Sequence, residues 1–208
     1  MQSNKKITDK RRFSVVMKIT AIVIVMAILI GSTAIYAGYY LHSTTMNQYY
    51  KNQVVNISKT LSKYIPADYI EQLKEAASDP KLETVREEAI ASDNPDLVKD
   101  WMIQKGVYDD YEKVLSILED FRNNMGMTYV YVLNNQANYS TYLADPDEDM
   151  TIFGKREDNT AGFEQYTSNE EIPPTVSEGE YGWLCSGYEP IYSEDGKAIA
   201  LIGVDISM

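Results

Sequence analysis

Cysteine and histidine are almost absent from this chain, and their scarcity excludes several kinds of site. The 208 residues include one cysteine, Cys185, and one histidine, His42. An intrachain disulfide is therefore impossible, and a zinc site cannot be built from cysteine and histidine side chains alone. A Ser-His-Asp or Cys-His catalytic mechanism meets the same obstacle, because the single histidine directly follows a long apolar segment that is predicted to lie in a membrane.

Basic side chains are also scarce, except near the N-terminus. Residues 1–41 carry six lysines and arginines and one acid, whereas residues 42–208 carry 13 basic and 30 acidic side chains, a net charge of −17. An acidic body of this kind repels phosphate groups, so nucleic-acid binding is not expected. The asymmetry predicts that the two parts of the chain lie in different environments. With 44% apolar residues, the composition still allows a buried core.

Charged residues are missing altogether from Ile19 to Leu41. As a helix this run would span roughly 34 Å, enough for a hydrocarbon core of about 30 Å. We predict a cytoplasmic basic tail over residues 1–14, a transmembrane helix over 15–41 and an extracytoplasmic domain over 42–208, because positive charge flanks only the N-terminal side. A cleaved signal peptide is the alternative, although its apolar region normally has about 7–15 residues.

A narrow apolar stripe continues the helical pattern beyond this segment, at spacings of four, three, four and three. It consists of Tyr50, Val54, Ile57, Leu61 and Tyr64. The stripe predicts a helix that ends before Pro66. Two interpretations remain open. Residues 42–65 form a stalk that pairs with the same stalk of a second copy, giving a homodimer, or the stripe packs on its own domain.

Further helices are predicted from apolar spacing and from the residues that begin and end them. They cover residues 67–77, 82–91, about 95–104 with Asp93 and Asn94 as N-cap, and 109–125, with Gly106 and Gly126 following the last two.

The pattern then changes to strands. Residues 127–133 and 139–144 are rich in aromatic and β-branched residues and predict a hairpin, and residues 183–192 and 197–206 predict a second one. Between the hairpins, residues 145–180 are polar and acidic and predict a long excursion with one short helix. The order of elements predicts an α+β fold, an antiparallel sheet with helices on one face.

At this point the chain resembles a known family. The run Tyr181-Gly-Trp-Leu-Cys-Ser-Gly-Tyr-Glu-Pro-Ile-Tyr192, then Asp195-Gly196, then Ile202-Gly-Val-Asp-Ile-Ser207, resembles the end of Cache domains. The run Met127-Thr-Tyr-Val-Tyr-Val-Leu133 after an amphipathic helix is similar to the start of their sheet. Cache domains are the PAS-like extracytoplasmic sensors of bacterial chemoreceptors, histidine kinases and diguanylate cyclases.

The resemblance implies a PAS-like antiparallel sheet with a long N-terminal helix packed on one face. It also implies a function: small-ligand sensing that is passed through membrane helices to a cytoplasmic output, in signal transduction or chemotaxis. The domain itself would not be an enzyme, and an output enzyme would lie beyond Met208 or in a partner. Many amino-acid-binding members carry an Arg-x-Trp-aromatic motif between the hairpins, where this chain has Lys155, Arg156, Phe163 and Tyr166 in another arrangement.

Asp205 is the sharpest candidate for ligand binding. By the period of two it shares a strand face with Leu201 and Gly203, and both faces of this strand are apolar. A carboxylate there needs a donor, because burial without a partner costs several kcal/mol. A ligand ammonium or hydroxyl would supply it, and Gly203 would leave room for the ligand. Alternatively, Asp205 lies at a frayed strand end and caps the next turn.

Aromatic side chains are candidates for lining a pocket around this carboxylate. They are Tyr129, Tyr131, Tyr142, Trp183 and Tyr188. Plain packing on the sheet is the alternative. Tyr129 and Tyr131 share one face, whereas Trp183 and Tyr188 fall on opposite faces unless a bulge near Gly187 intervenes.

Arg156, next to Lys155, is a candidate for holding a ligand carboxylate, although solvated loop charges are the simpler interpretation. The acidic run over residues 145–149 lacks the spacing of a calcium loop, so no metal site is predicted, and no cofactor. The predicted partners are therefore the membrane, a second copy and a small organic ligand of the amino acid, carboxylate or amine class. The alternative function is a membrane-anchored dimerisation or partner-binding module without a small ligand.

Overall fold

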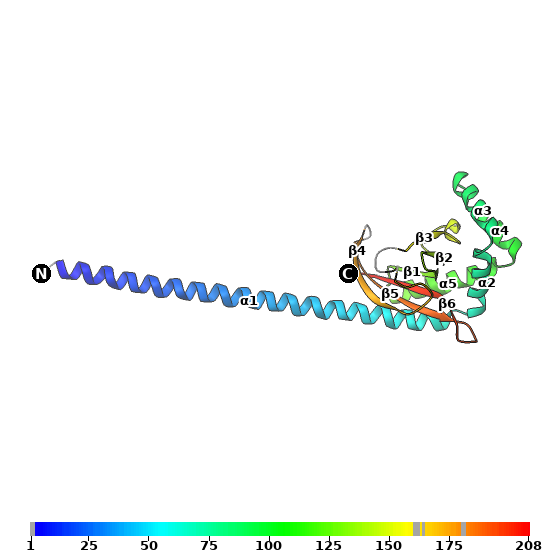
Figure 1. The fold of residues 1–208 in the computed structure, drawn as a ribbon. Coiled ribbons are helices and arrows are strands. Elements are labelled where there is room, and N and C mark those ends of the chain that lie inside the picture. Colours follow the sequence, from blue (N-terminus) through cyan, green and yellow to red (C-terminus); the bar gives the residue numbers. More distant parts are fainter. Residues whose placement is uncertain (1–2, 160–162, 164, 180–181) are drawn as a thin grey trace. The chain divides into compact units, whose positions relative to one another are not determined.

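The structure, a computed structural model, describes residues 3–159, 163, 165–179 and 182–208, and for residues 3–14 the backbone alone. The chain divides into two compact units, residues 1–46 and residues 47–208. Helix α1, Ser3–Tyr64, supplies the whole of the described first unit and continues into the second (Figure 1).

The first unit has the properties expected of a membrane span. Within the described residues, α1 is the one helix that is long and apolar enough to cross a bilayer. An 18-residue window of it has a mean hydropathy of 2.5, and none of that window is buried inside the protein. Unburied apolar length of this kind is compatible with the predicted transmembrane helix.

The second unit contains four further α-helices, one 3₁₀ helix and six strands in its described residues. The helices are α2 (Ala67–Ala77), α3 (Pro80–Ala91), α4 (Asp96–Lys105), α5 (Tyr108–Met125) and η1 (Met150–Ile152). The strands are β1 (Tyr129–Asn135), β2 (Tyr139–Ala144), β3 (Arg156–Asp158), β4 (Ile172–Gly179), β5 (Gly182–Tyr192) and β6 (Ala198–Ser207).

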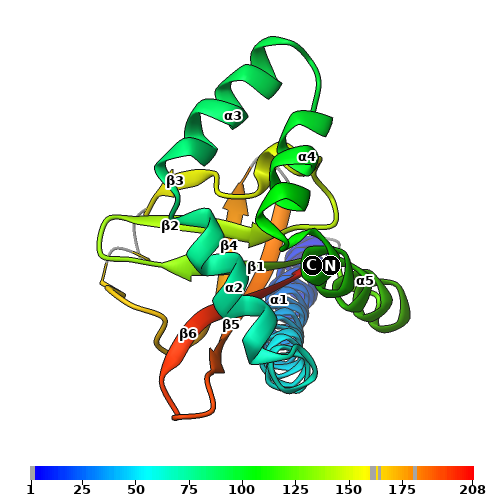
Figure 2. The same cartoon turned by 90° about the vertical axis from the view of Figure 1, so that its right-hand side faces the viewer.

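The strands form one antiparallel sheet in the order β3-β2-β1-β6-β5-β4. Two sequential hairpins, β1–β2 and β5–β6, meet in the middle, where β1 pairs with β6. Figure 2 shows α2 crossing in front of the sheet. The predicted α+β class, an antiparallel sheet with a long N-terminal helix packed on one face, is confirmed.

One face of the sheet carries the hydrophobic core and is covered by helices. Alternate residues of the central strands, such as Val130, Val132, Ile202 and Val204, pack in one buried cluster with apolar side chains of α1, α2 and α5. The helical contributors include Val54, Leu61, Ile70, Leu73, Val114 and Leu118. This is the expected result of a period of two in the strands meeting apolar stripes on the helices.

The apolar stripe of α1 packs on its own sheet. Val54 and Leu61 are fully buried, and Tyr50 and Ile57 pack against the same core. Tyr64 is 65% exposed, yet its ring lies 5.4 Å from that of Phe121. Of the two interpretations of the stripe, the structure therefore shows intramolecular packing, and a homodimer through residues 42–65 stays a prediction.

Among the glycines of the sheet, Gly187 of β5 lies closest to α1. A Cβ atom built on Gly187 would lie 2.8 Å from Cβ of Val54 and 3.0 Å from the Val54 carbonyl carbon. Real Cβ atoms do not approach a backbone so closely, so only glycine lets the helix lie this near to β5.

Two expectations about local structure were wrong. Residues 145–180 were expected to be an excursion with one short helix. Their described residues do contain one short helix, η1, but also two strands that were not expected, β3 and β4. Pro173 and Pro174 disguise β4 because proline cannot donate to a ladder. The structure accommodates them by placing β4 at the sheet edge, with a register shift between Ile172 and Thr175.

The other error concerns the start of α4. Asp93 and Asn94 were expected to cap this helix, with Pro95 in its first turn. Pro95 itself occupies the N-cap position, and no side chain caps the helix there. Asp93 has a positive φ of 51°, which belongs to the turn that ends α3. Gly106 and Gly126 end α4 and α5 in left-handed conformations, as predicted.

Replacing Gly187 with alanine should destabilise the second unit by about 1–3 kcal/mol, because the new methyl group collides with the backbone of α1 and overpacks the interface. Gly179→Ala is the matched control, since nothing lies within 4 Å of a Cβ at that position. Thermal unfolding of the full chain in detergent micelles measures both. Equal melting temperatures for the two variants would contradict the close approach of α1 to β5.

Candidate functional site

The face of the sheet opposite the helices gathers tyrosine side chains around one carboxylate. Tyr129 of β1 pairs with Asp205 of β6, and Tyr131 pairs with Gly203. On the other side of β6, Ser186 pairs with Asp205 and Tyr188 pairs with Gly203. The antiparallel register thus places these side chains in two neighbouring rows, which we call the tyrosine face.

Asp205 is a buried residue inside β6, and not a cap at a frayed strand end. Asp205 is only 6% exposed. The Tyr131 hydroxyl donates a hydrogen bond to Oδ2 of Asp205 at 3.2 Å. The other carboxylate oxygen, Oδ1, is buried and has no hydrogen-bond partner in the part of the chain that the structure describes. An acceptor left in this state costs about 1–3 kcal/mol, and more when it is charged.

Burial also raises the pKa of Asp205, because the charged form is desolvated. The nearby hydroxyls of Ser186 and Tyr131 oppose this shift by stabilising the carboxylate, although the Ser186 hydroxyl does not complete a hydrogen bond to Oδ1. The Tyr131 and Tyr188 hydroxyl oxygens lie 3.2 Å apart. Since Tyr131 gives its one proton to Asp205, Tyr188 must be the donor in that pair. Burial raises the pKa of Tyr188 to about 12, so both hydroxyls stay protonated near neutral pH.

Gly203 does not leave room for a ligand, contrary to the expectation from the sequence. A Cβ atom on Gly203 would lie 2.1 Å from Cε2 of Tyr131. The space beside Gly203 is therefore filled by the Tyr131 ring itself. This packing fixes the ring so that its hydroxyl reaches Asp205, which makes Gly203 a positioning residue for Tyr131.

A second buried carboxylate, Asp145, follows β2 at the same side of the sheet. It is 8% exposed, and its Oδ1 accepts a hydrogen bond from the backbone N–H of Asp147 at 3.0 Å. Desolvation is the largest cause that raises the pKa of Asp145, to about 6, and the neighbouring charges of Asp147 and Glu148 add to it. Arg122 opposes the shift and forms an ion pair with Asp147.

Two small cavities open on the tyrosine face. The larger, of about 250 Å³, is lined by Tyr129, Tyr131, Tyr142, Asp145, Asp147, Glu148, Leu184 and Asp205. The smaller, of about 140 Å³, shares Tyr131 and Tyr142 and adds Tyr188 and Phe163. Pockets for drug-sized ligands have about 300–1,000 Å³, so these cavities fit a small metabolite.

Buried asparagine side chains join part of the segment between the hairpins to β1 and β6. The side chain of Asn169 accepts from the backbone N–H of Asn135 at 2.7 Å and donates to Oδ1 of Asn134 and to the carbonyl of Ile199. The ring of Phe163 lies 5.0 Å from that of Tyr188. Phe163 lines the smaller cavity, whereas Asn134, Asn135 and Asn169 line neither cavity.

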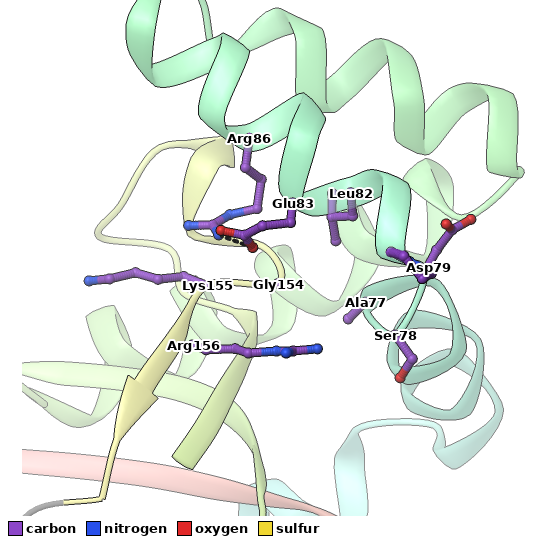
Figure 3. Close-up of a pocket in the computed structure, with 10 residues that line it drawn as sticks. Ala77, Ser78, Asp79, Leu82, Glu83, Arg86, Gly154, Lys155 and Arg156 are labelled. Atoms are coloured by element: carbon purple, nitrogen blue, oxygen red, sulfur yellow. Dashed lines mark hydrogen bonds and ion pairs between the residues drawn. The ribbon is translucent and has the colours of Figure 1, made fainter.

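Arg156 lies outside the cavity that Asp205 lines. Its guanidinium lies over the Tyr139 ring at 5.0 Å, and it lines a separate hollow of about 640 Å³ between β3 and the start of α3. Figure 3 shows it there with Lys155 and Arg86. Arg156 pairs with Thr141 of β2, and the next residue of β3, Glu157, accepts a hydrogen bond from the Tyr142 hydroxyl. Because adjacent residues of a strand point to opposite faces, Arg156 points away from Tyr142.

Trp183 is also separate from the site. It is 51% exposed and lies on the opposite face of β5 from Ser186 and Tyr188. The register of β5 against β6 is unbroken at Gly187, so the bulge that could have joined the two faces is absent there. Of the predicted site residues, Asp205, Tyr129, Tyr131, Tyr142 and Tyr188 come together, and Arg156 and Trp183 do not.

Ser186 and Asp145 are members of the site that were not predicted from the sequence. Ser186 could have been found from the period of two, because it is two residues before Tyr188 on the same strand. Asp145 was treated as part of a solvated acidic run, and its burial depends on how that run folds back beside the sheet. Among the described residues there is no cluster of three potential metal ligands.

Comparisons with known proteins give general likenesses. No family model and no curated protein matches the chain. Among solved structures, the sensor domain of DcuS from E. coli is 14% identical at a TM-score of 0.35, over 71% of this chain and 92% of that one. The Campylobacter jejuni chemoreceptor Tlp3 ligand-binding domain with L-valine is 16% identical at a TM-score of 0.30. The Tlp3 sensory domain with isoleucine is 15% identical at 0.28.

The chain spans 61% and 62% of the length of these two Tlp3 domains. Likenesses at TM-scores below 0.5 do not establish a shared fold or a shared ligand. An assignment of function must therefore come from the cavity itself.

The buried carboxylates make stability depend on pH. The folded-state pKa of Asp145 of about 6 exceeds its ordinary value of 3.8, so the folded protein binds more protons than the unfolded chain between these values. The free energy of unfolding should fall as pH rises from about 4 to 6. Asp145→Asn should flatten this dependence, and Asp100→Asn, at an exposed position of α4, should not. Thermal unfolding of the full chain at several pH values measures it, and parallel profiles for all three proteins would contradict the burial of Asp145.

Proposed function

We propose that residues 42–208 are an extracytoplasmic sensing module, held by the membrane helix over residues 15–41, that binds a small ligand through a protonated amine on Asp205. The observation that carries this proposal is the buried Oδ1 of Asp205, which lacks a hydrogen-bond partner in the described part of the chain. Native proteins rarely leave a buried charged acceptor unsatisfied, and a ligand is one reason to do so.

An amine fits this site better than a carboxylate or a neutral hydroxyl. Of the residues that line the 250 Å³ cavity, four are acidic and none is lysine or arginine. An ammonium group supplies N–H donors for Oδ1 and a positive charge that favours the ionised form of Asp205. Tyrosine rings in the wall attract a cation through their faces. A ligand carboxylate would find no cation among these lining residues.

Strand β5 offers a route from the ligand to the membrane helix. Ser186 and Tyr188 face the cavity side of the sheet, and Gly187 between them meets Val54 of α1 on the other side. A ligand that shifts β5 therefore acts on α1 through a rigid steric contact. The ligand can favour one arrangement of α1 only by its differential affinity for the two arrangements. An output domain, located in a further part of the protein or in a partner, would receive this signal.

A second candidate function is an anchored partner-binding module without a small ligand. The observation in its favour is that aromatic rings fill much of the tyrosine face. The Tyr131 ring covers Gly203, and Phe163 packs on Tyr188. In this alternative Oδ1 of Asp205 would be satisfied by ordered water. An enzymatic role is not proposed.

Asp205→Asn should abolish amine binding without unfolding the protein, since asparagine keeps the shape and removes the uncompensated charge. The full chain in detergent micelles would be screened by thermal unfolding against amines, carboxylates and neutral polyols. A ligand at 100 times its Kd stabilises by about 2.7 kcal/mol, which raises the melting temperature by several degrees. Asp100→Asn is the control for the charge change, because its side chain is exposed.

The proposal predicts a shift from amines alone, lost in Asp205→Asn and kept in Asp100→Asn. A shift from carboxylates, or an amine shift that survives in Asp205→Asn, would refute the role of Asp205. A folded chain that responds to no compound would favour the partner-binding module.

A further inference from the structure

The acids around the 250 Å³ cavity are more numerous than one ammonium group can neutralise. Asp205 closes the cavity on the sheet side, and Asp145, Asp147 and Glu148 line it from the segment after β2. Arg122 pairs with Asp147, and no ion pair engages Asp145, Glu148 or Asp205 within the described residues. Three carboxylates thus line one small cavity without an ion pair of their own among the described residues, although Arg122, which pairs with Asp147, acts on Asp145 from nearby.

These carboxylates come from two sides of β1, because Asp205 lies in β6 and the other acids follow β2. Among the described residues, no three acidic, histidine or cysteine side chains are close enough to hold one metal ion. Separated negative charges suit an extended ligand with a positive charge at each end better than a compact divalent ion, which requires several oxygens at about 2.0–2.6 Å.

The wall between the acids is apolar and aromatic. Tyr129, Tyr131, Tyr142 and Leu184 line the same cavity. Such side chains pack against methylene groups, and tyrosine faces also favour a nearby ammonium group. Tyr129 and Tyr131 belong to β1, which lies between β6 with Asp205 and β2 with the acidic segment that follows it, so tyrosine rings separate Asp205 from Asp145 and Glu148.

We propose that this cavity selects a small α,ω-diamine, with one ammonium group on Asp205 and the other between Asp145 and Glu148. The inference rests on the proposed function, because it takes the Asp205 subsite as given and adds a second subsite. It also excludes simple amino acids as ligands, because their carboxylate would meet the acids of that second subsite. The unpartnered oxygen of Asp205, a residue that is only 6% exposed, marks the first subsite independently of the acidic segment.

Three matched probes test the second subsite: butylamine, 1,4-diaminobutane and 4-aminobutanoate, which share four carbons and differ in the group opposite the amine. Isothermal titration of the full chain in detergent micelles should show 1,4-diaminobutane binding at least tenfold more tightly than butylamine, and 4-aminobutanoate more weakly than butylamine. Asp145→Asn should reduce the preference for the diamine about tenfold and leave the affinity for butylamine nearly unchanged. The amide oxygen introduced by this substitution keeps an acceptor for the backbone N–H of Asp147.

The failures of the two proposals can be told apart. Equal affinities for the three probes, all lost in Asp205→Asn, would overturn the second subsite and leave the first. Binding of none of the probes by the folded chain would overturn both. If Asp145→Asn does not fold, Glu148→Gln replaces it, because Glu148 is exposed, and the ranking of the three probes on the wild-type chain decides in any case.

Discussion

The burial of one carboxylate without a full set of partners is the constraint on which the site depends. Asp205 lies in the middle of the sheet, where Tyr131 satisfies one oxygen and nothing described satisfies the other. Tyr188 supports Tyr131, and Gly203 gives the Tyr131 ring its place. Each of these residues keeps a charged group in a position that costs free energy in the empty protein. In the function that we propose, a ligand ammonium group would recover that cost, so that the free energy lost at Asp205 on folding would become affinity and selectivity for the ligand.

The sheet separates two tasks between its faces. Val130 and Val132 of β1 and Ile202 and Val204 of β6 build the core with α1, α2 and α5, whereas Tyr129, Tyr131 and Asp205 lie on the tyrosine face. Since adjacent residues of a strand point to opposite faces, a shift in β5 at Ser186 or Tyr188 must also move Gly187 against α1. Coupling between cavity and helix then needs no further element, because close packing transmits small displacements.

Much of this organisation is readable from the sequence, and the failures have identifiable physical causes. The period of two placed Tyr129 with Tyr131 on one face of their strand and Asp205 with Gly203 on one face of theirs, and glycines marked the ends of α4 and α5. Only the pairing of β1 with β6 shows that the two sets lie on the same face of the sheet. The long segment after β2 was misjudged because its edge strand contains two prolines and its acids are buried by contacts distant in sequence. Arg156 was assigned to the site by residue type, and Trp183 could join it only through a bulge near Gly187. The unbroken register of β5 at that position leaves Trp183 on the other face. Gly203 was wrongly expected to leave room for a ligand, because the sequence shows that this residue has no side chain but does not show that the Tyr131 ring fills the space beside it.

The most direct test of the account is a crystal structure of the full chain with butylamine bound, at a resolution that distinguishes water from ligand. The account predicts the amine nitrogen within about 3 Å of Oδ1 of Asp205, with the butyl chain against the tyrosine rings. An ordered water on Oδ1, with butylamine absent or bound elsewhere, would contradict it and would make Asp205 a structural residue of a module that recognises no small amine.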